Sequence, residues 1–324
     1  MRLMGGEMAS NIPESGVLTD SGRSSLALLL QSDTLRGRRF LLPDFLCSSI
    51  LQVFDRLNIS YRFYHLRPDL TADPAICPHA DEAWYQIDYF GVRPTLPPDW
   101  PSDLPVVEDG VFLPLLSPPE RLSCWAGYTS FRKITPAGDG SLVMATFPLP
   151  SRLLRPESAP YALTKADGRR LKAEFLRTGQ GREEEYLRLF ADGETQLDRQ
   201  QQMFRPSTTA MDAVMTFLSE LPRHRAAAAV NLQYLQQELA PWAVPLAPDF
   251  PCFLPLRLPP GRRDTVRRQL AEQRCFLPVH WPRPAHPELS TQPLYDELLS
   301  LPVDSRYGKD DMRQLAAAIL TALK

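Results

Sequence analysis

The chain has 324 residues, of which 44% are hydrophobic and 23% charged, so it is long enough for two domains or one large α/β domain with a sizeable core. Its formal net charge of −2 excludes a general attraction to nucleic acid or to an anionic membrane. Five scattered cysteines without a Cys-x-x-Cys pair, and N-terminal residues 1–16 without the apolar core of a signal peptide, predict a cytoplasmic protein with no structural metal and no membrane segment.

The first half of the chain alternates helix-like and strand-like segments. Residues 21–30 open with serine and glycine and continue as an apolar run, which predicts a turn followed by a helix. The remaining segments predict a strand at 39–44, a helix at 48–57, and strands at 60–66, 83–90, 105–109 and 142–147. Strands that alternate with helices indicate a mostly parallel sheet, in which ligands bind beyond the carboxyl ends of the strands.

The second half of the chain has a different pattern. It predicts a charge-rich helical segment at 163–190, a helix pair at 208–239 interrupted at Pro222, a strand at 250–258, a helix at 262–273, a strand at 275–281 and a closing helix at 310–323 with Asp310 near its cap. This order favours a smaller α+β domain. We therefore expect a large α/β domain over residues 1–160, and linker helices with a small C-terminal domain over residues 161–324.

Four features of the first half carry possible chemistry, since the motifs of hydrolases, P-loops, dinucleotide folds and zinc proteases are all absent. They are the turn at Ser21, the strand-end acid Asp109, the pair Ser130-x-x-Lys133, and the Gly-Asp-Gly loop at 138–140. Together they suit pyridoxal phosphate, because a helix N-terminus binds phosphate, a carboxylate pairs with the pyridine nitrogen, and a lysine forms a Schiff base. Each feature also has a plain structural reading, as a cap, a loop acid or a solvated surface lysine.

The same motifs, in their order along the chain, resemble one protein family. Ser21-Gly-Arg-Ser-Ser-Leu26, Asp88-Tyr-Phe-Gly91, Val106-Val-Glu-Asp109 and Ser130-Phe-Arg-Lys133 with its glycine loop look like those of the DegT/StrS aminotransferases, which are pyridoxal-phosphate enzymes of fold type I. The segments at 253–257, 279–282 and 301–312 extend the resemblance to roughly residues 15–324. It implies a mostly parallel central sheet with helices on both faces, plus a smaller C-terminal α+β domain.

The resemblance also assigns roles to single residues. Lys133 matches the Schiff-base lysine and is the implied catalytic residue. The implied cofactor contacts are the backbone amides of Arg23 and Ser24, the carboxylate of Asp109, and the side chains of Val111, Ser130 and Lys133. Tyr89 and His280 fall on the substrate side, where core packing is the alternative for each, and Arg205 and Ser207 match a segment that reaches the phosphate in the neighbouring subunit.

The function implied by the resemblance is an aminotransferase that moves an amino group from an amino acid, with glutamate as the expected donor, to a keto acceptor such as a keto-sugar nucleotide. A homodimer with its site at the interface is implied as well. Three departures from the family pattern, at Phe112, Ser141 and Met203, leave open a catalytically impaired protein on the same fold. Another pyridoxal-phosphate reaction, such as a lyase, is a third alternative.

Overall fold

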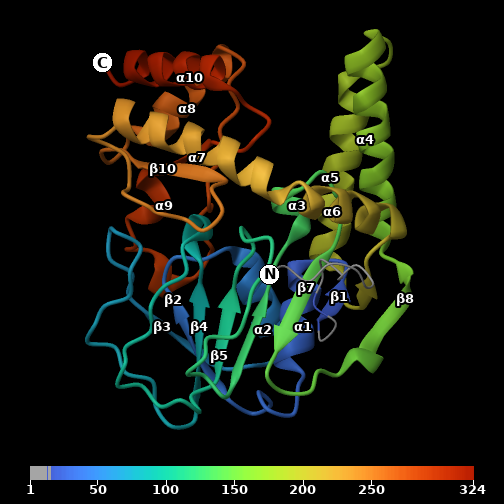
Figure 1. Cartoon of the computed structure of the whole chain (residues 1–324), viewed down its shortest axis with the longest axis vertical. Helices are drawn as coiled ribbons and strands as arrows, with labels where there is room; N and C mark the ends of the chain where they lie inside the picture. Colours follow the sequence, from blue (N-terminus) through green and yellow to red (C-terminus); the bar gives the residue numbers. More distant parts are fainter. Residues whose placement is uncertain (1–12, 14–15) are drawn as a thin grey trace, which may run out of the picture.

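A seven-stranded sheet forms the centre of the computed structural model, which describes residue 13 and residues 16–324 (Figure 1). Its order is β1-β7-β6-β5-β4-β2-β3. The strands are β1 (Val17–Thr19), β2 (Arg39–Pro43), β3 (Tyr61–Tyr64), β4 (Glu82–Ile87), β5 (Val106–Asp109), β6 (Trp125–Tyr128) and β7 (Ser141–Ala145). Strand β7 runs antiparallel to both of its neighbours, β1 and β6, and the other strand pairs are parallel, so the prediction of a mostly parallel sheet is confirmed.

The first two helices pack together beside the sheet. They are α1 (Gly22–Leu30) and α2 (Ser48–Arg56), and α1 also contacts β6 and β7. Helix α1 begins where predicted, because the Ser21 hydroxyl caps it by accepting the backbone N–H of Ser24 at 3.2 Å. A short helix α3 (Phe131–Ile134) follows β6, and the 3-10 turns η1 (Tyr89–Gly91) and η2 (Ser151–Leu153) follow β4 and precede β8.

A helical hairpin projects from the sheet domain in Figure 1, formed by α4 (Pro160–Thr178) and α5 (Glu183–Arg199). The sequence predicted one charge-rich helical segment there, and the structure breaks it at Gly179, whose positive φ of 69° ends α4. The helices approach closely at glycines, since a Cβ added to Gly193 would lie 2.6 Å from the Lys165 side chain. Short parallel strands β8 (Leu154–Ser158) and β9 (Met203–Arg205) lie on either side of the hairpin in sequence.

The C-terminal part of the chain forms a second unit around the antiparallel pair of β10 (Phe253–Arg257) and β11 (Leu298–Pro302). Its helices are α6 (Thr208–Ser219), α7 (Leu221–Glu238), α8 (Arg263–Glu272), α9 (Leu294–Glu297) and α10 (Lys309–Ala322), with the 3-10 turn η3 (Pro287–Leu289). The predicted strand at 275–281 is wrong, because the segment is irregular and Pro278 has no N–H for a strand ladder. Asp311, not Asp310, caps α10 by accepting the backbone N–H of Gly308 at 2.8 Å.

Two large apolar clusters stabilise these units. One surrounds the sheet and includes parts of α6 and residues 281–298, whereas the other joins α7, α8, α10, β10 and β11. Because residues beyond 160 contribute to both clusters, the domain boundary at 160 stays a prediction. The N-terminal stretch used for the signal-peptide prediction lies almost wholly outside the described residues. Within residue 13 and residues 16–324, no helix is long and apolar enough to cross a membrane.

Candidate active site

A cavity of 410 Å³ lies beyond the carboxyl ends of β1, β5 and β6, where a parallel sheet places its ligands. Most of the predicted site residues meet in this sheet-end cavity. Those that line it are Arg23, Asp109, Val111, Ser130, Lys133 and His280. A larger hollow of 620 Å³ lies near the carboxyl ends of α1 and α2 and holds none of the predicted residues.

Lys133 is the amine of the sheet-end cavity. Short helix α3 presents it, and its Nζ lies 4.9 Å from the ring centre of Phe112 and 5.9 Å from that of Trp281. Burial lowers the pKa of Lys133, while Cys47 and Asp109 oppose that shift. No acidic side chain among the described residues forms an ion pair with Lys133. The amine is therefore uncommitted and more often uncharged than a surface lysine.

Asp109 ends strand β5 and is almost completely buried beside the cavity. One carboxylate oxygen accepts the hydroxyls of Tyr85 at 2.9 Å and Tyr128 at 2.8 Å, and the other accepts the backbone N–H of Val111 at 3.2 Å. Burial raises the pKa of Asp109, and the positive charge of Lys133 acts in the opposite direction. The two tyrosines fix the carboxyl group in one orientation, and sequence reasoning missed both of them.

The cavity is also lined by hydrogen-bond donors for an anion. The Ser130 hydroxyl has no partner among the described residues, although its side chain is buried at the cavity wall. The first turn of α1 adds the backbone N–H groups of Gly22 and Arg23, which make no hydrogen bond within the described chain. The role expected for Ser24 needs a correction, because its N–H is already used by the Ser21 cap and it lines a neighbouring hollow instead.

Aromatic side chains form the wall opposite α1. Phe112 occupies the position where the resembling family has a polar residue, and it packs against Phe253 and His280 at centroid distances of 5.6 and 5.3 Å. Trp281 completes this wall. Burial, with the nearby charge of Lys133, lowers the pKa of His280 to about 3, so the imidazole is neutral at ordinary pH.

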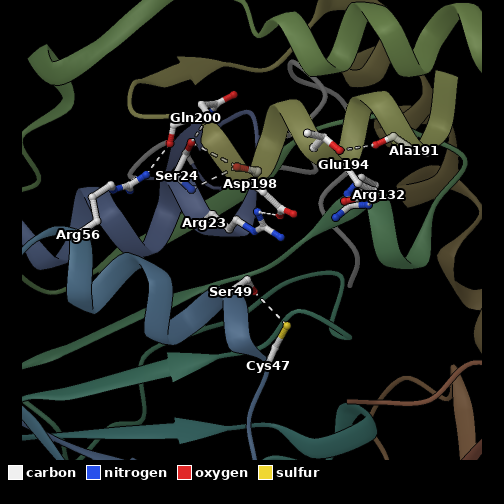
Figure 2. A network of polar contacts seen from close by, with 12 residues as sticks. Arg23, Ser24, Cys47, Ser49, Arg56, Arg132, Ala191, Glu194, Asp198 and Gln200 are labelled. Atoms are coloured by element: carbon white, nitrogen blue, oxygen red, sulfur yellow. Dashed lines mark hydrogen bonds and ion pairs between the residues drawn. The ribbon is translucent and has the colours of Figure 1, made fainter. Parts of the chain in front are cut away.

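Two arginines stand at the mouth of the cavity, each paired with an acid of α5 (Figure 2). Arg23 lies 2.5 Å from Asp198, and Arg132 lies 2.9 Å from Glu194. Glu194 also pairs with Lys165 of α4, whose pKa burial lowers to about 8. The acids are four residues apart and therefore face the same side of α5. The α4–α5 hairpin thus places two carboxylates at one side of the cavity mouth, where each pairs with one of the two arginines.

Besides Ser24, three predicted residues lie away from the cavity within the chain. Tyr89 is core, as the alternative reading held, because its hydroxyl donates to the carbonyl of Phe45 and its ring packs among aromatic neighbours. Ser207 caps α6 and also donates to Asp139 at 2.8 Å. Arg205 is exposed on β9. A role for Ser207 and Arg205 in a neighbouring subunit stays a prediction.

Two departures from the family pattern have structural explanations. Ser141 is buried at the start of β7, and its hydroxyl contacts that of Ser25 at 2.6 Å, linking the strand to α1. Met203 is buried in β9 against Gln31. Neither residue lines the sheet-end cavity. Ser141 and Met203 therefore serve the packing of the fold and do not contact a ligand in this cavity.

Further residues line the cavity that the motifs did not reveal. They are Cys47 and Ser49 at the start of α2, Arg132 beside the lysine, Glu194 and Leu197 of α5, and Phe253 and Trp281 of the C-terminal unit. Ser49 donates to the Cys47 sulfur at 3.1 Å (Figure 2). Arg132 was detectable from its place beside Lys133. Phe253 and Trp281 lie in the segments 253–257 and 279–282 of the resemblance, whereas the residues of α2 and α5 carry no local signal.

The donor set of this cavity fits pyridoxal phosphate. Free donors suit a phosphate, a fixed carboxyl group suits a pyridine nitrogen, and an uncommitted amine lies close enough to Asp109 to influence its pKa. Val111 and Phe112 provide apolar surface for a planar ring. Among the described residues no cluster of histidine, cysteine and acids could hold a metal ion.

Comparisons with known proteins identify the fold. No family model matches the sequence, and no curated protein matches it either. A DegT DnrJ EryC1 StrS aminotransferase from Brucella abortus is 14% identical with a TM-score of 0.60, covering 94% of this chain and 85% of its own. DesI, solved in the presence of its TDP-sugar product, is 18% identical with a TM-score of 0.63, covering 95% and 81%.

A third neighbour bears on the cofactor. Spr1654 from Streptococcus pneumoniae, a candidate sugar aminotransferase in its PLP-form, is 10% identical with a TM-score of 0.63, covering 95% of this chain and 86% of its own. At such identities the likeness establishes the fold. The chain has the fold of the DegT/StrS aminotransferases, as the motifs predicted, and the predicted fold class is confirmed.

Proposed function

We propose that this chain, which has the fold of the DegT/StrS aminotransferases, is a pyridoxal-phosphate-dependent aminotransferase. The observation that carries the proposal is the Lys133 amine, which lines the sheet-end cavity without an ion-pair partner among the described residues, together with the fixed carboxyl of Asp109 and the free donors of Ser130 and α1. Glutamate is the expected amino donor, and a keto sugar carried on a nucleotide is the expected acceptor.

The surroundings of each residue in the cavity indicate its role in the proposed reaction. Ser130 and the N–H groups of Gly22 and Arg23 would bind the phosphate. Asp109 would hold a proton at the pyridine nitrogen, and the hydroxyls of Tyr85 and Tyr128 fix the orientation of its carboxyl group. When bound, the cofactor supplies an electron sink for negative charge on the substrate carbon. Lys133 has a lowered pKa, so its Nζ is available as a nucleophile and as the base that moves a proton.

The acceptor class rests on the character of the wall and on the structural neighbours. Phe112 and Trp281 offer aromatic surface to the C–H face of a sugar ring. Among the neighbours of the same fold, DesI was solved with a TDP-sugar product. A homodimer belongs to the same proposal, with Arg205 and Ser207 of each chain expected near the phosphate of the other.

Absorption spectroscopy tests the function directly. We expect the protein to develop a visible band when titrated with pyridoxal phosphate, and Lys133→Ala to abolish it. Lys165→Ala is the matched control, because Lys165 is also buried with a lowered pKa yet is paired with Glu194 and does not line the cavity. Borohydride treatment followed by peptide mass analysis should place the modification on Lys133.

The turnover tests separate the alternatives. L-Glutamate should bleach the band, and a TDP-4-keto sugar should restore it. Persistence of the band with every amino acid tried would indicate a different reaction type. No band at saturating cofactor would overturn the proposal and leave a non-catalytic protein on this fold.

A further inference from the structure

His280 enters the sheet-end cavity in one fixed orientation. Its ring meets the rings of Phe253, Phe112 and Phe90 at centroid distances of 4.7, 5.3 and 6.1 Å, with interplanar angles of 64°, 75° and 71°. These edge contacts come from both units of the structure, since Phe253 lies on β10 and the other two follow β4 and β5. The imidazole therefore has little freedom to rotate.

One ring nitrogen of His280 is bound to a buried serine. Nδ1 lies 3.0 Å from the Oγ of Ser300, which is completely buried on β11. The Ser300 side chain makes no other hydrogen bond among the described residues. A buried hydroxyl proton without an acceptor is costly, so the Ser300 hydroxyl donates to Nδ1. Nδ1 is then the acceptor nitrogen of a neutral imidazole, and the proton is on Nε2.

The second nitrogen of His280 has no hydrogen-bond partner among the described residues. His280 lines the cavity, and its Nε2 makes no hydrogen bond to any described residue. The charged neighbour of the ring is Lys133, and its positive charge acts with burial to keep the imidazole neutral. The imidazole therefore presents to the cavity a single uncharged N–H donor.

We propose that His280, through Nε2–H, donates a hydrogen bond to a hydroxyl or keto oxygen of the acceptor sugar, and that Ser300 is the positioning residue that fixes this tautomer. The inference rests on the proposed function for the identity of the ligand. An uncharged donor in an aromatic wall suits an uncharged oxygen on a ring that packs against Phe112. It offers no acceptor to an ammonium group and no counter-charge to a carboxylate.

The tautomer can be measured without cofactor or substrate. We expect the ¹⁵N spectrum of histidine-labelled protein, assigned with His280→Gln, to show a protonated Nε2 and an unprotonated Nδ1 that do not titrate between pH 5 and 9. In Ser300→Ala the two tautomers should mix, and Ser300→Thr should restore the original one. A protonated Nδ1 in the wild type, or a His280 that gains charge in this range, would overturn the proposal.

Kinetics test the ligand, with a TDP-4-keto sugar as the probe for the second half-reaction. His280→Phe should raise the KM for the probe about tenfold, whereas His280→Gln keeps a neutral donor and should stay within about threefold of wild type. The band with pyridoxal phosphate and its bleaching by glutamate should remain in both variants. An unchanged KM in His280→Phe, or a wild type that glutamate bleaches and the probe never restores, refutes the assigned ligand. A missing band in the wild type refutes the proposed function instead, while the ¹⁵N result still decides the tautomer.

Discussion

Replacing Asp109 by asparagine should slow the glutamate half-reaction strongly and change the free energy of unfolding only slightly. Both effects follow from the contacts of the carboxyl group. An asparagine oxygen can still accept the hydroxyls of Tyr85 and Tyr128, now 2.9 and 2.8 Å from the carboxylate. Its amide group would face the N–H of Val111, which then loses its acceptor at a cost of about 1–3 kcal/mol. It would also donate to a pyridine nitrogen, where a carboxyl holds a proton.

The loss of the buried charge acts in the opposite direction. Because burial raises the folded-state pKa of Asp109 above 3.8, its favourable contribution is complete only below that value and is lost as the pH rises through the folded-state pKa. At pH 7 the raised pKa of Asp109 therefore costs stability, and asparagine removes that penalty. We expect the unfolding free energy to change by no more than about 1–2 kcal/mol. The glutamate half-reaction should slow by about 10²–10³.

The assay combines urea unfolding with stopped-flow bleaching of the visible band by glutamate. Glu108→Gln is the control, because Glu108 is the preceding residue of β5 and its contacts are structural, with Arg93 at 2.6 and 2.9 Å and Trp125 at 2.7 Å. It should lose about 2–3 kcal/mol of stability with a normal half-reaction. A destabilised Asp109→Asn with an unchanged bleaching rate would refute the reasoning.

The remaining predictions concern three other side chains. Lys133→Met should raise the melting temperature of the cofactor-free protein at pH 7, because the lowered pKa of Lys133 in the folded state means that the unfolded chain binds more protons. This gain in melting temperature should vanish as the pH approaches 10.5. A lower melting temperature of the variant at every pH would contradict the prediction. Ser130→Ala should raise the Kd for pyridoxal phosphate about tenfold in an absorbance titration, because one hydrogen bond to the phosphate is lost. An unchanged Kd would show that Ser130 does not bind the phosphate. Ser207→Ala should lower the unfolding free energy by about 1–2 kcal/mol in urea, because α6 loses its cap and Asp139 loses a donor; an unmoved midpoint would contradict this.

The sequence predicted the parts of the site that lie on single strand-to-helix turns. Asp109 ends β5 and Lys133 follows the adjacent strand β6, so local pattern and motif order were enough to place them together. Ser24 was assigned to the phosphate because spacing alone does not show which N–H of a helix turn is consumed by its cap. Ser21 consumes that of Ser24, which leaves the preceding N–H groups free.

Other parts of the site depend on tertiary packing that no short window contains. Tyr128 looks like any apolar strand residue until β6 pairs with β5 and sets it opposite Asp109. Glu194 reads as one charge on a solvated helix until α5 folds back toward the cavity. The segment at 275–281 alternates like a strand, yet Pro278 interrupts it, and its irregular path brings His280 to the cavity wall.

The composition of the cavity wall has a consequence for biosynthesis of the protein. Ser21 at one side and Trp281 at the other come from the two ends of the chain, and β1 joins the sheet by pairing with the much later β7. Contacts between such distant residues form late, because long loops must close first. Until the C-terminal unit has folded, the aromatic wall lacks Phe253 and Trp281. Under the proposed function, we therefore expect the complete cofactor site to form only after the C-terminal unit has folded.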